Sequence, residues 1–153
     1  MITTWRIVKA EHASEAFSGK GAALNAGRWH SDGTRVVYTA QSISLATLEI
    51  IVHMRHRRHI PDYMLIPCYF HEVLAEALDL EALPKNWADA IAPTELRRFG
   101  DEWAASRASA VLIVPSAVTQ VEFNYLLNPE HPDFHMIDVG EPRPFHMDVR
   151  LYT

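Results

Sequence analysis

"GRWHSDGTRVVYTAQSISLATLEI", residues 27–50, joins a β-forming segment to a segment whose apolar residues recur at helical spacing. The first part, "TRVVYTA", is rich in β-branched and aromatic residues, which favour a strand. The second part predicts a helix from about Ser44 to about His56, with Ser42 or Ser44 as its N-cap. The stretch therefore predicts a strand that leads directly into a helix.

Glu49 is the unexpected residue of this predicted helix. At about 100° per residue it lies about 40° from Leu45, on the face expected to pack against the core. The apolar members of that face are Leu45, Leu48 and Val52. A buried carboxylate is costly unless it is paired or hydrogen-bonded, and Arg28 and Tyr38 are the nearest candidate partners in the sequence. The pattern fits a structural Arg–Glu pair and a functional site equally well.

The composition is that of a soluble globular protein. Of 153 residues, 48% are hydrophobic and 22% are charged, which predicts one folded domain over residues 1–153. No stretch approaches the roughly 20 apolar residues that span a bilayer. The first residues, "MITTWRIVKAEH", lack the layout of a signal peptide. We therefore expect a cytoplasmic protein with no membrane partner.

Cysteine content and charge exclude further classes. The single cysteine, Cys68, rules out an internal disulfide framework and a zinc site of several thiolates, and we expect it to be a buried, inert thiol. The formal net charge of -5 argues against nucleic acid as the main partner, because phosphate binding usually requires a basic excess.

The order of predicted elements indicates an α+β fold. A second helix is expected to begin near Thr94, with Leu96, Phe99 and Trp103 on one apolar stripe. Strands alternate irregularly with the two helices, unlike a regular βαβ repeat. The five or six predicted strands are "TTWRIVKA", "TRVVYTA", "YMLIPCYF", "AVLIVPS", "FHMIDV" and "FHMDVRLY".

Two polar features precede the helix of Glu49. Arg6 lies in a strand otherwise suited to burial, where an arginine either grips a diphosphate or is the charge of an edge strand. The small-residue segment "GKGAALNAG" before Arg28 allows a ligand to approach the backbone closely. It matches neither the Walker pattern nor GxGxxG, so it carries little weight alone.

A third group of polar residues follows the apolar run "AVLIVP". Ser116 comes directly after that run, and no GxSxG elbow surrounds it, so we expect a hydroxyl that positions a ligand. Asn124 and Asn128 are four residues apart. We interpret Asn128, which precedes Pro129, as a turn or helix-stop residue.

The cluster "HMRHRRH", residues 53–59, invites a metal or nucleic-acid interpretation. Its histidines lie three apart, unlike the HExxH pair, and no carboxylate is interleaved, so we expect no metal site. A basic helix end is usually a solvated terminus that complements the helix dipole. Contact with substrate phosphates or an acidic partner is the other reading of the cluster.

Nearly the whole chain resembles the RES domain. The resemblance is carried by three segments in this order: "WRI", "GRWHSDGTRVVYTAQSISLATLE" and "VPSAVTQVEFNYLLNPEHPDF". This family provides the toxins of Xre-RES type II toxin–antitoxin pairs. The resemblance implies an ADP-ribosyltransferase-like split β-sheet with flanking helices and an NAD+ cleft. It also implies Arg28, Glu49 and Ser116 as catalytic residues. Arg6, Tyr38 and Asn124 join Arg28 and Ser116 as the expected NAD+-binding residues.

The implied reaction uses NAD+ as a substrate, with no prosthetic group. Breaking the nicotinamide–ribose bond places positive charge on the ribose, which Glu49 stabilises. Arg6 and Arg28 would hold the pyrophosphate and the nicotinamide ribose, Tyr38 would border the nicotinamide, and Ser116 would bond the ribose or carboxamide. Water, phosphate and a protein side chain all stay open as acceptors of ADP-ribose.

The resemblance also implies partners. They are an Xre-like helix-turn-helix antitoxin, a protein acceptor of ADP-ribose, and a second toxin copy within the toxin–antitoxin complex. Nucleic acid is then contacted only through the antitoxin. Two other hypotheses compete with this one: a nucleic-acid-binding or nuclease-like toxin that uses "HMRHRRH", and an inactive interaction domain in which Arg28 and Glu49 form only a structural pair.

Overall fold

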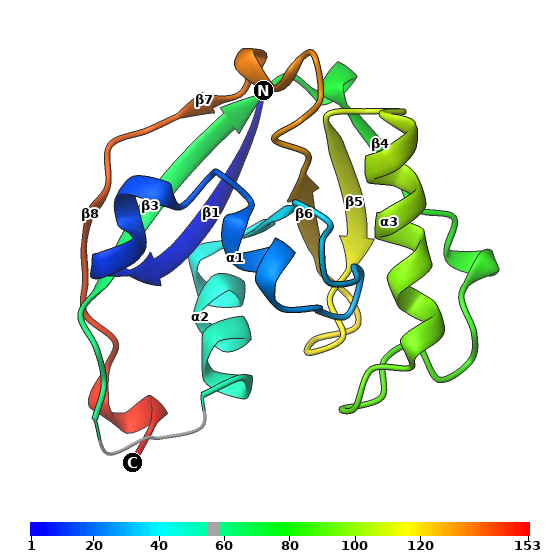
Figure 1. The fold of residues 1–153 in the computed structure, drawn as a ribbon. Helices are drawn as coiled ribbons and strands as arrows, with labels where there is room; N and C mark the ends of the chain where they lie inside the picture. Colours follow the sequence, from blue (N-terminus) through cyan, green and yellow to red (C-terminus); the bar gives the residue numbers. More distant parts are fainter. Residues whose placement is uncertain (55–58) are drawn as a thin grey trace.

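The computed structural model describes residues 1–54 and 59–153. These residues form a mixed α+β fold with a curled sheet and flanking helices, which confirms the predicted class (Figure 1). The strands are β1 (Ile2–Lys9), β2 (Val37–Ala40), β3 (Tyr63–Phe70), β4 (Ala75–Ala77), β5 (Val111–Pro115), β6 (Phe123–Leu127), β7 (Asp138–Val139) and β8 (Arg143–Phe145). The α-helices are α1 (Lys20–Leu24), α2 (Ile43–Val52) and α3 (Arg97–Ser106). Short 3₁₀ helices are η1 (Ala10–Glu15), η2 (Glu72–Leu74), η3 (Leu80–Ala82), η4 (Thr94–Leu96), η5 (Phe134–Met136) and η6 (Val149–Leu151).

The sheet is divided at its centre. Its strand order is β4-β5-β6-β2-β1-β3-β7, with β8 also paired to β3; β4 and β5 run parallel, and the other described pairs are antiparallel. β1 pairs with β3 over its whole length, but its register with β2 is a single pair, Trp5 with Ala40. Beyond that pair the two strands diverge, and Figure 1 shows β1 and β3 turning away from β5 and β6.

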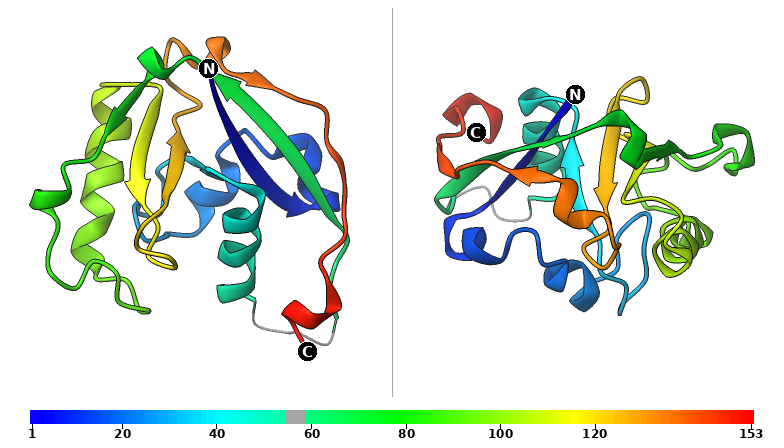
Figure 2. Two further views of the ribbon diagram at one scale, coloured as in Figure 1. Left: turned by 180° about the vertical axis from the view of Figure 1, so that it is seen from behind. Right: turned by 90° about the horizontal axis from the view of Figure 1, so that it is seen from above.

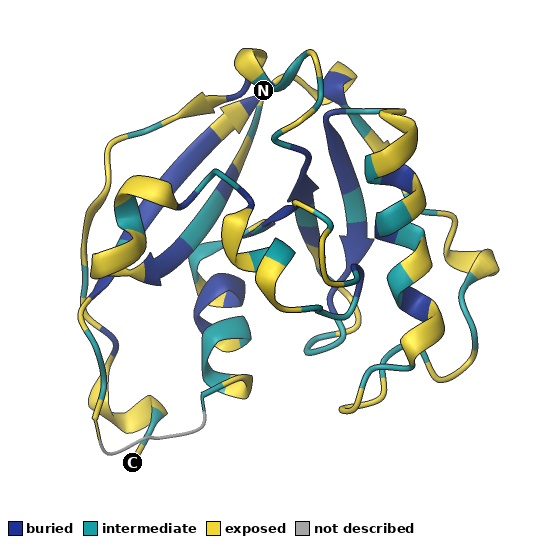
Figure 3. Ribbon diagram, in the orientation of Figure 1, coloured by how far each residue is buried: buried dark blue, intermediate teal, exposed yellow. Residues whose placement is uncertain are grey.

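Two helices pack on different parts of the sheet (Figure 2). α2 contacts β1 and β2, and its buried Leu45 and Ala46 pack with apolar residues of β1 and β3. α3 covers the other half, where Trp103 joins Leu112 and Leu126 in a separate cluster. α2 therefore packs across the junction of β1 and β2, and α3 packs beside β5 and β6. Figure 3 shows buried residues along the strands and in parts of α2 and α3.

The start of α2 follows the sequence prediction and its end does not. Ser42 is the N-cap, because its Oγ accepts a hydrogen bond from the Leu45 amide at 3.0 Å. The helix ends at Val52 rather than near His56, which lies outside the described residues. The imidazole Nδ1 of His53 contacts the Glu49 carbonyl at 2.8 Å, and the His53 amide bonds Ile50 instead. A side chain therefore occupies the carbonyl that the next helical turn would use.

Some predicted strands are also corrected. The segment "FHMDVRLY" is not a strand, because β8 ends at Phe145 and η6 follows. β4 is too short, and β6 too polar at Asn124, for alternation alone to identify them. Cys68 is buried as expected, and burial raises the pKa of its thiol to about 12. None of the helices in residues 1–54 and 59–153 is long and apolar enough to cross a bilayer.

Candidate active site

A cleft of about 1380 Å³ opens where β1 and β2 diverge. α2 supplies one wall, and the segments that follow α1 and β5 supply others. Apolar and small side chains dominate the lining, and a few convergent polar groups stand among them, as in most ligand sites. The polar residues that the sequence predicted and that line this cleft are Arg6, Arg28, Tyr38, Glu49 and Asn124.

The Glu49 carboxylate is held by two donors from the opposite half of the sheet. Its Oε1 accepts a hydrogen bond from Ser116 Oγ at 3.0 Å and another from Asn124 Nδ2 at 2.9 Å. Within the described residues Oε2 accepts none. The carboxylate is therefore fixed through one oxygen, and the other is left for a ligand.

These partners differ from the ones that the sequence suggested. Arg28 and Tyr38 were the nearest candidates along the chain, yet neither forms a hydrogen bond or ion pair with Glu49 in the described structure. Leu48 and Val52 are exposed, so the predicted apolar face is wrong; Leu45, Ala46 and Thr47 are the buried residues of α2. α2 is rotated so that Glu49 borders the cleft instead of the core.

Ser116 and Asn124 reach Glu49 because of the strands that carry them. Ser116 follows the last residue of β5, as predicted, and is fully buried. Its Oγ also accepts a hydrogen bond from the Val118 amide at 3.1 Å. Asn124, on β6, is 9% exposed, and its Oδ1 is buried without a partner among the described residues. Ser116 thus bonds Glu49 without lining the cleft, whereas Asn124 both bonds Glu49 and lines the cleft.

Arg6 brings a buried positive charge to the cleft. Because β1 has neighbours on both sides, the edge-strand interpretation of this arginine is wrong. Nε donates to the Ala16 carbonyl and Nη1 to the Tyr38 carbonyl, both at 2.8 Å. Burial lowers its pKa to about 10, so the side chain stays protonated at neutral pH. Its partners are neutral carbonyls, and the charge is available to an anionic ligand.

The Arg28 guanidinium is fixed by hydrogen bonds from two of its nitrogens to two backbone carbonyls. Nη1 donates to Trp87 at 2.8 Å and Nη2 to Asp89 at 2.9 Å. Burial lowers its pKa, and the nearby charge of Glu49 opposes that shift. The structural ion pair between Arg28 and Glu49, one of the two alternatives, is not formed among the described residues.

The segment that carries Arg28 is fixed to α3. The Asp101 carboxylate accepts hydrogen bonds from the Ser31 amide at 2.8 Å, the Ser31 hydroxyl, and the Thr34 hydroxyl at 2.8 Å. A Cβ on Gly100 would lie 2.0 Å from the Trp29 carbonyl oxygen, so the helix backbone packs directly on this segment. Burial alone would raise the pKa of Asp101, but the hydrogen bonds from Ser31 and Thr34 hold it below its usual value.

Tyr38 lines the cleft with its hydroxyl turned to a residue that the sequence analysis missed. The Oη lies 2.7 Å from His30 Nδ1 and 3.4 Å from the Trp29 amide. Burial raises the pKa of the Tyr38 hydroxyl. The position of His30 beside Arg28 and Trp29 in "GRWH" is a signal for it, but the pattern does not reveal that the imidazole is buried.

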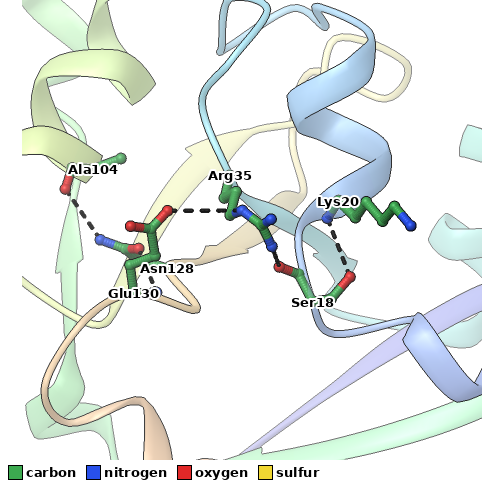
Figure 4. A network of polar contacts seen from close by, with 6 residues as sticks. All are labelled: Ser18, Lys20, Arg35, Ala104, Asn128 and Glu130. Atoms are coloured by element: carbon green, nitrogen blue, oxygen red, sulfur yellow. Dashed lines mark hydrogen bonds and ion pairs between the residues drawn. The ribbon is translucent and has the colours of Figure 1, made fainter.

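The remaining polar candidates lie elsewhere or outside the described residues. His53 and His59 border the cleft, whereas residues 55–58 of the basic cluster are not described. In the described ranges no group of three or more His, Cys, Asp or Glu side chains is placed to hold a metal. Asn128 is a turn residue, as interpreted: Nδ2 donates to Ala104 at 3.2 Å, and Oδ1 accepts from the Glu130 amide at 3.0 Å (Figure 4).

Comparison with known proteins gives a consistent result. The profile of the RES domain matches residues 3–148. "Toxin Res" of Photorhabdus laumondii is 36% identical over 148 residues, covering 96% of this chain and 95% of the relative. "Toxin Res" of Yersinia enterocolitica is 33% identical, with 96% and 97% covered. The "Prs ADP-ribosylating toxin" of Sphingobium sp. strain YBL2 is 34% identical, with 96% and 94% covered.

A solved structure shares the fold. The crystal structure of the M. tuberculosis MbcT-MbcA toxin-antitoxin complex contains a chain that superimposes with a TM-score of 0.78 at 14% identity. The match covers 99% of this chain and 86% of that one. Profile, relatives and fold agree over almost the entire sequence, and the protein belongs to the RES domain family.

Proposed function

We propose that this protein is the toxin of a type II toxin–antitoxin pair and that it consumes NAD+ by breaking the nicotinamide–ribose bond. The names of its relatives support a toxin, and the Sphingobium relative is named for ADP-ribosylation, a reaction whose usual donor is NAD+. The observation that carries the chemistry is the Glu49 carboxylate, fixed through Oε1 in a cleft that also contains two arginines.

A fixed carboxylate suits the charge that develops in this reaction. The nicotinamide of NAD+ departs as a neutral ring, so positive charge accumulates on the ribose in the transition state. The free Oε2 of Glu49 would face that charge, and its attraction is stronger in the transition state than in the bound substrate. Glu49 is therefore the proposed catalytic residue, with Ser116 and Asn124 holding it in place.

The other polar residues fit the rest of the substrate. Arg6 and Arg28 bring positive charge for the pyrophosphate and the nicotinamide ribose, and Tyr38 offers a wall for the nicotinamide. NAD+ enters this proposal as a substrate and not as a resident cofactor.

The same proposal includes the acceptor and the antitoxin. ADP-ribose passes to water, phosphate or a protein side chain. An Xre-like helix-turn-helix antitoxin inhibits the toxin and makes the contact with DNA, and two toxin copies meet in the complex. The nuclease-like alternative is not favoured, because the sequence is acidic overall and the relatives are named as toxins of the RES type or for ADP-ribosylation.

One incubation tests this function. Purified protein is mixed with NAD+ alone, with inorganic phosphate and with cell extract, and the products are identified by mass spectrometry. Release of nicotinamide that is lost in Glu49→Gln supports the proposal, and the mass of the ADP-ribose product identifies the acceptor. Intact NAD+ in all three mixtures, with a folded protein, contradicts it.

A further inference from the structure

His30 is almost fully buried beside the cleft, with an exposed fraction of 2%. Its Nε2 faces two backbone carbonyls, Ala22 at 2.8 Å and Asn25 at 2.9 Å. Carbonyl oxygens only accept hydrogen bonds, so Nε2 must carry a proton. None of the hydrogen-bond partners of the ring is an anion. The Asp101 carboxylate lies near enough to interact with the ring but bonds Ser31 and Thr34 instead, and burying an imidazolium is costly. The ring is therefore best satisfied as the neutral Nε2–H tautomer.

This tautomer fixes the direction of the hydrogen bond to Tyr38. An unprotonated Nδ1 accepts, so the Tyr38 hydroxyl, 2.7 Å away, donates to it. The hydroxyl oxygen in turn accepts a hydrogen bond from the Trp29 amide at 3.4 Å. Gly27 packs against both side chains: a Cβ there would lie 2.9 Å from the His30 ring and 3.0 Å from the Tyr38 hydroxyl.

Tyr38 needs such a restraint because space lies next to it. It lines the main cleft, and it also lines a second cavity of about 240 Å³ together with His30 and Asn25. Arg6 holds the Tyr38 backbone through its carbonyl, and the apolar cluster around Trp29 packs against the body of the ring, so the hydroxyl end is the part that still needs a restraint. The bond to His30 fixes the other end of the residue. Without that bond, the smaller cavity gives the hydroxyl end of the ring space to shift, and this part of the cleft wall is less fixed.

We infer that His30 is a positioning residue: as the neutral Nε2–H tautomer it accepts the hydroxyl proton of Tyr38 and so holds that ring as a fixed wall of the NAD+ site. The tautomer of His30 follows from the geometry alone. The effect on NAD+ kinetics rests on the proposed function. His30 touches no substrate in this account and acts through Tyr38. Since a wall contacts bound substrate and transition state alike, its loss raises KM and leaves kcat nearly unchanged.

Two substitutions separate positioning from mere stability. His30→Phe keeps the size of the ring but removes the acceptor, and we expect KM for NAD+ to rise about five- to tenfold. His30→Asn keeps an acceptor near the position of Nδ1 but cannot reach the two carbonyls. It should lose thermal stability as His30→Phe does, yet keep KM within about threefold of the unmodified protein. A KM that rises equally in both variants overturns the inference.

Two further variants complete the kinetic test. Asn128→Ala removes a buried turn residue that bonds Ala104 and Glu130 rather than His30 or Tyr38, and it should lower Tm without changing KM. Tyr38→Phe should raise KM for NAD+ as much as His30→Phe does. The KM of the double variant should be no more than about twofold higher than that of either single variant, because both substitutions remove the same hydrogen bond. Additive effects of the two substitutions, or a raised KM in Asn128→Ala, overturn the inference.

Nitrogen NMR of the imidazole rings tests the geometry without any turnover. The signals of His30 are identified among those of the nine histidines by their loss in His30→Phe. We expect a protonated Nε2 and an unprotonated Nδ1 at neutral pH, with the Nδ1 signal displaced in Tyr38→Phe. A protonated Nδ1 overturns the assignment even if the protein cleaves NAD+. An inactive protein with the expected tautomer contradicts the proposed function and leaves the bond to Tyr38 established.

Discussion

Ser116 Oγ lies 3.0 Å from Glu49 Oε1, although 67 residues separate the two in the chain. The serine follows β5, and the glutamate projects from α2, which packs across β1 and β2. A fully buried hydroxyl has few positions open to it, so this bond presets the direction of the carboxylate before a ligand arrives. The cleft is thus built around a group that is already oriented.

Ser116→Ala removes one of the two donors to Glu49. We expect kcat for nicotinamide release to fall about 10- to 100-fold, because a hydrogen bond to a charged group contributes roughly 1.5–3 kcal/mol. Stability should fall by about 1 kcal/mol in urea unfolding, since the Val118 amide also loses its partner. Ser109→Ala is the control, because that hydroxyl bonds Trp103 and Val111 instead. Equal activity in the two variants would argue against any role of Ser116 in holding Glu49.

Arg28→Lys tests the guanidinium fork. A lysine ammonium cannot reproduce two parallel bonds to the carbonyls of Trp87 and Asp89, so the positive charge should lose its fixed position. We expect KM for NAD+ to rise about tenfold at low salt, measured by initial rates. Arg98→Lys, an exposed change on α3, should leave KM as it is. A KM unaffected by Arg28→Lys would show that substrate binding does not depend on this geometry.

Gly100→Ala tests the contact between α3 and the Arg28 segment. The new Cβ would meet the Trp29 carbonyl oxygen at 2.0 Å, so the backbone must shift. We expect a loss of about 1–3 kcal/mol in the free energy of unfolding, together with reduced nicotinamide release. Gly21→Ala meets nothing within 4 Å and should be neutral or slightly stabilising. Similar denaturant midpoints for the two variants would contradict this packing.

Asp101 predicts a pH dependence of stability. Its pKa is lower in the folded protein than the ordinary value of about 3.9, so its contribution is present above that pH and is lost as pH falls through the folded value. Asp101→Asn removes this contribution. The difference in unfolding free energy between the two proteins should be constant from about pH 7 to pH 5 and shrink toward about pH 3. A difference that grows on acidification would reverse the assigned sign.

Much of the fold follows from local patterns. The strand that leads into a Ser42-capped helix, and the strand that ends at Ser116, were both predictable because capping and apolar runs are local features. The short β4 and the polar β6 were not, since their pairing depends on neighbours distant in the sequence. The end of α2 was missed because the His53 side chain competes for a helix carbonyl.

The candidate residues of the site could be named from the sequence, but the way they are arranged could not. The resemblance to the RES family brought Arg6, Arg28, Tyr38 and Asn124 to attention, and all four line one cleft. The sequence paired Glu49 with residues close along the chain, whereas its partners come from β5 and β6. Helical periodicity also placed Leu48 in the core, because it cannot tell a core from a cleft wall.

The most direct test of the account is the rate of nicotinamide release by Glu49→Gln. The amide keeps an oxygen that accepts from Ser116 and Asn124, so we expect a Tm close to that of the unmodified protein. Glu102→Gln, an exposed change on α3, is the matched control and should be fully active. Loss of the negative charge should slow release about 100- to 1000-fold in Glu49→Gln. A folded Glu49→Gln protein that keeps more than roughly a tenth of the rate would contradict the central role given to this carboxylate.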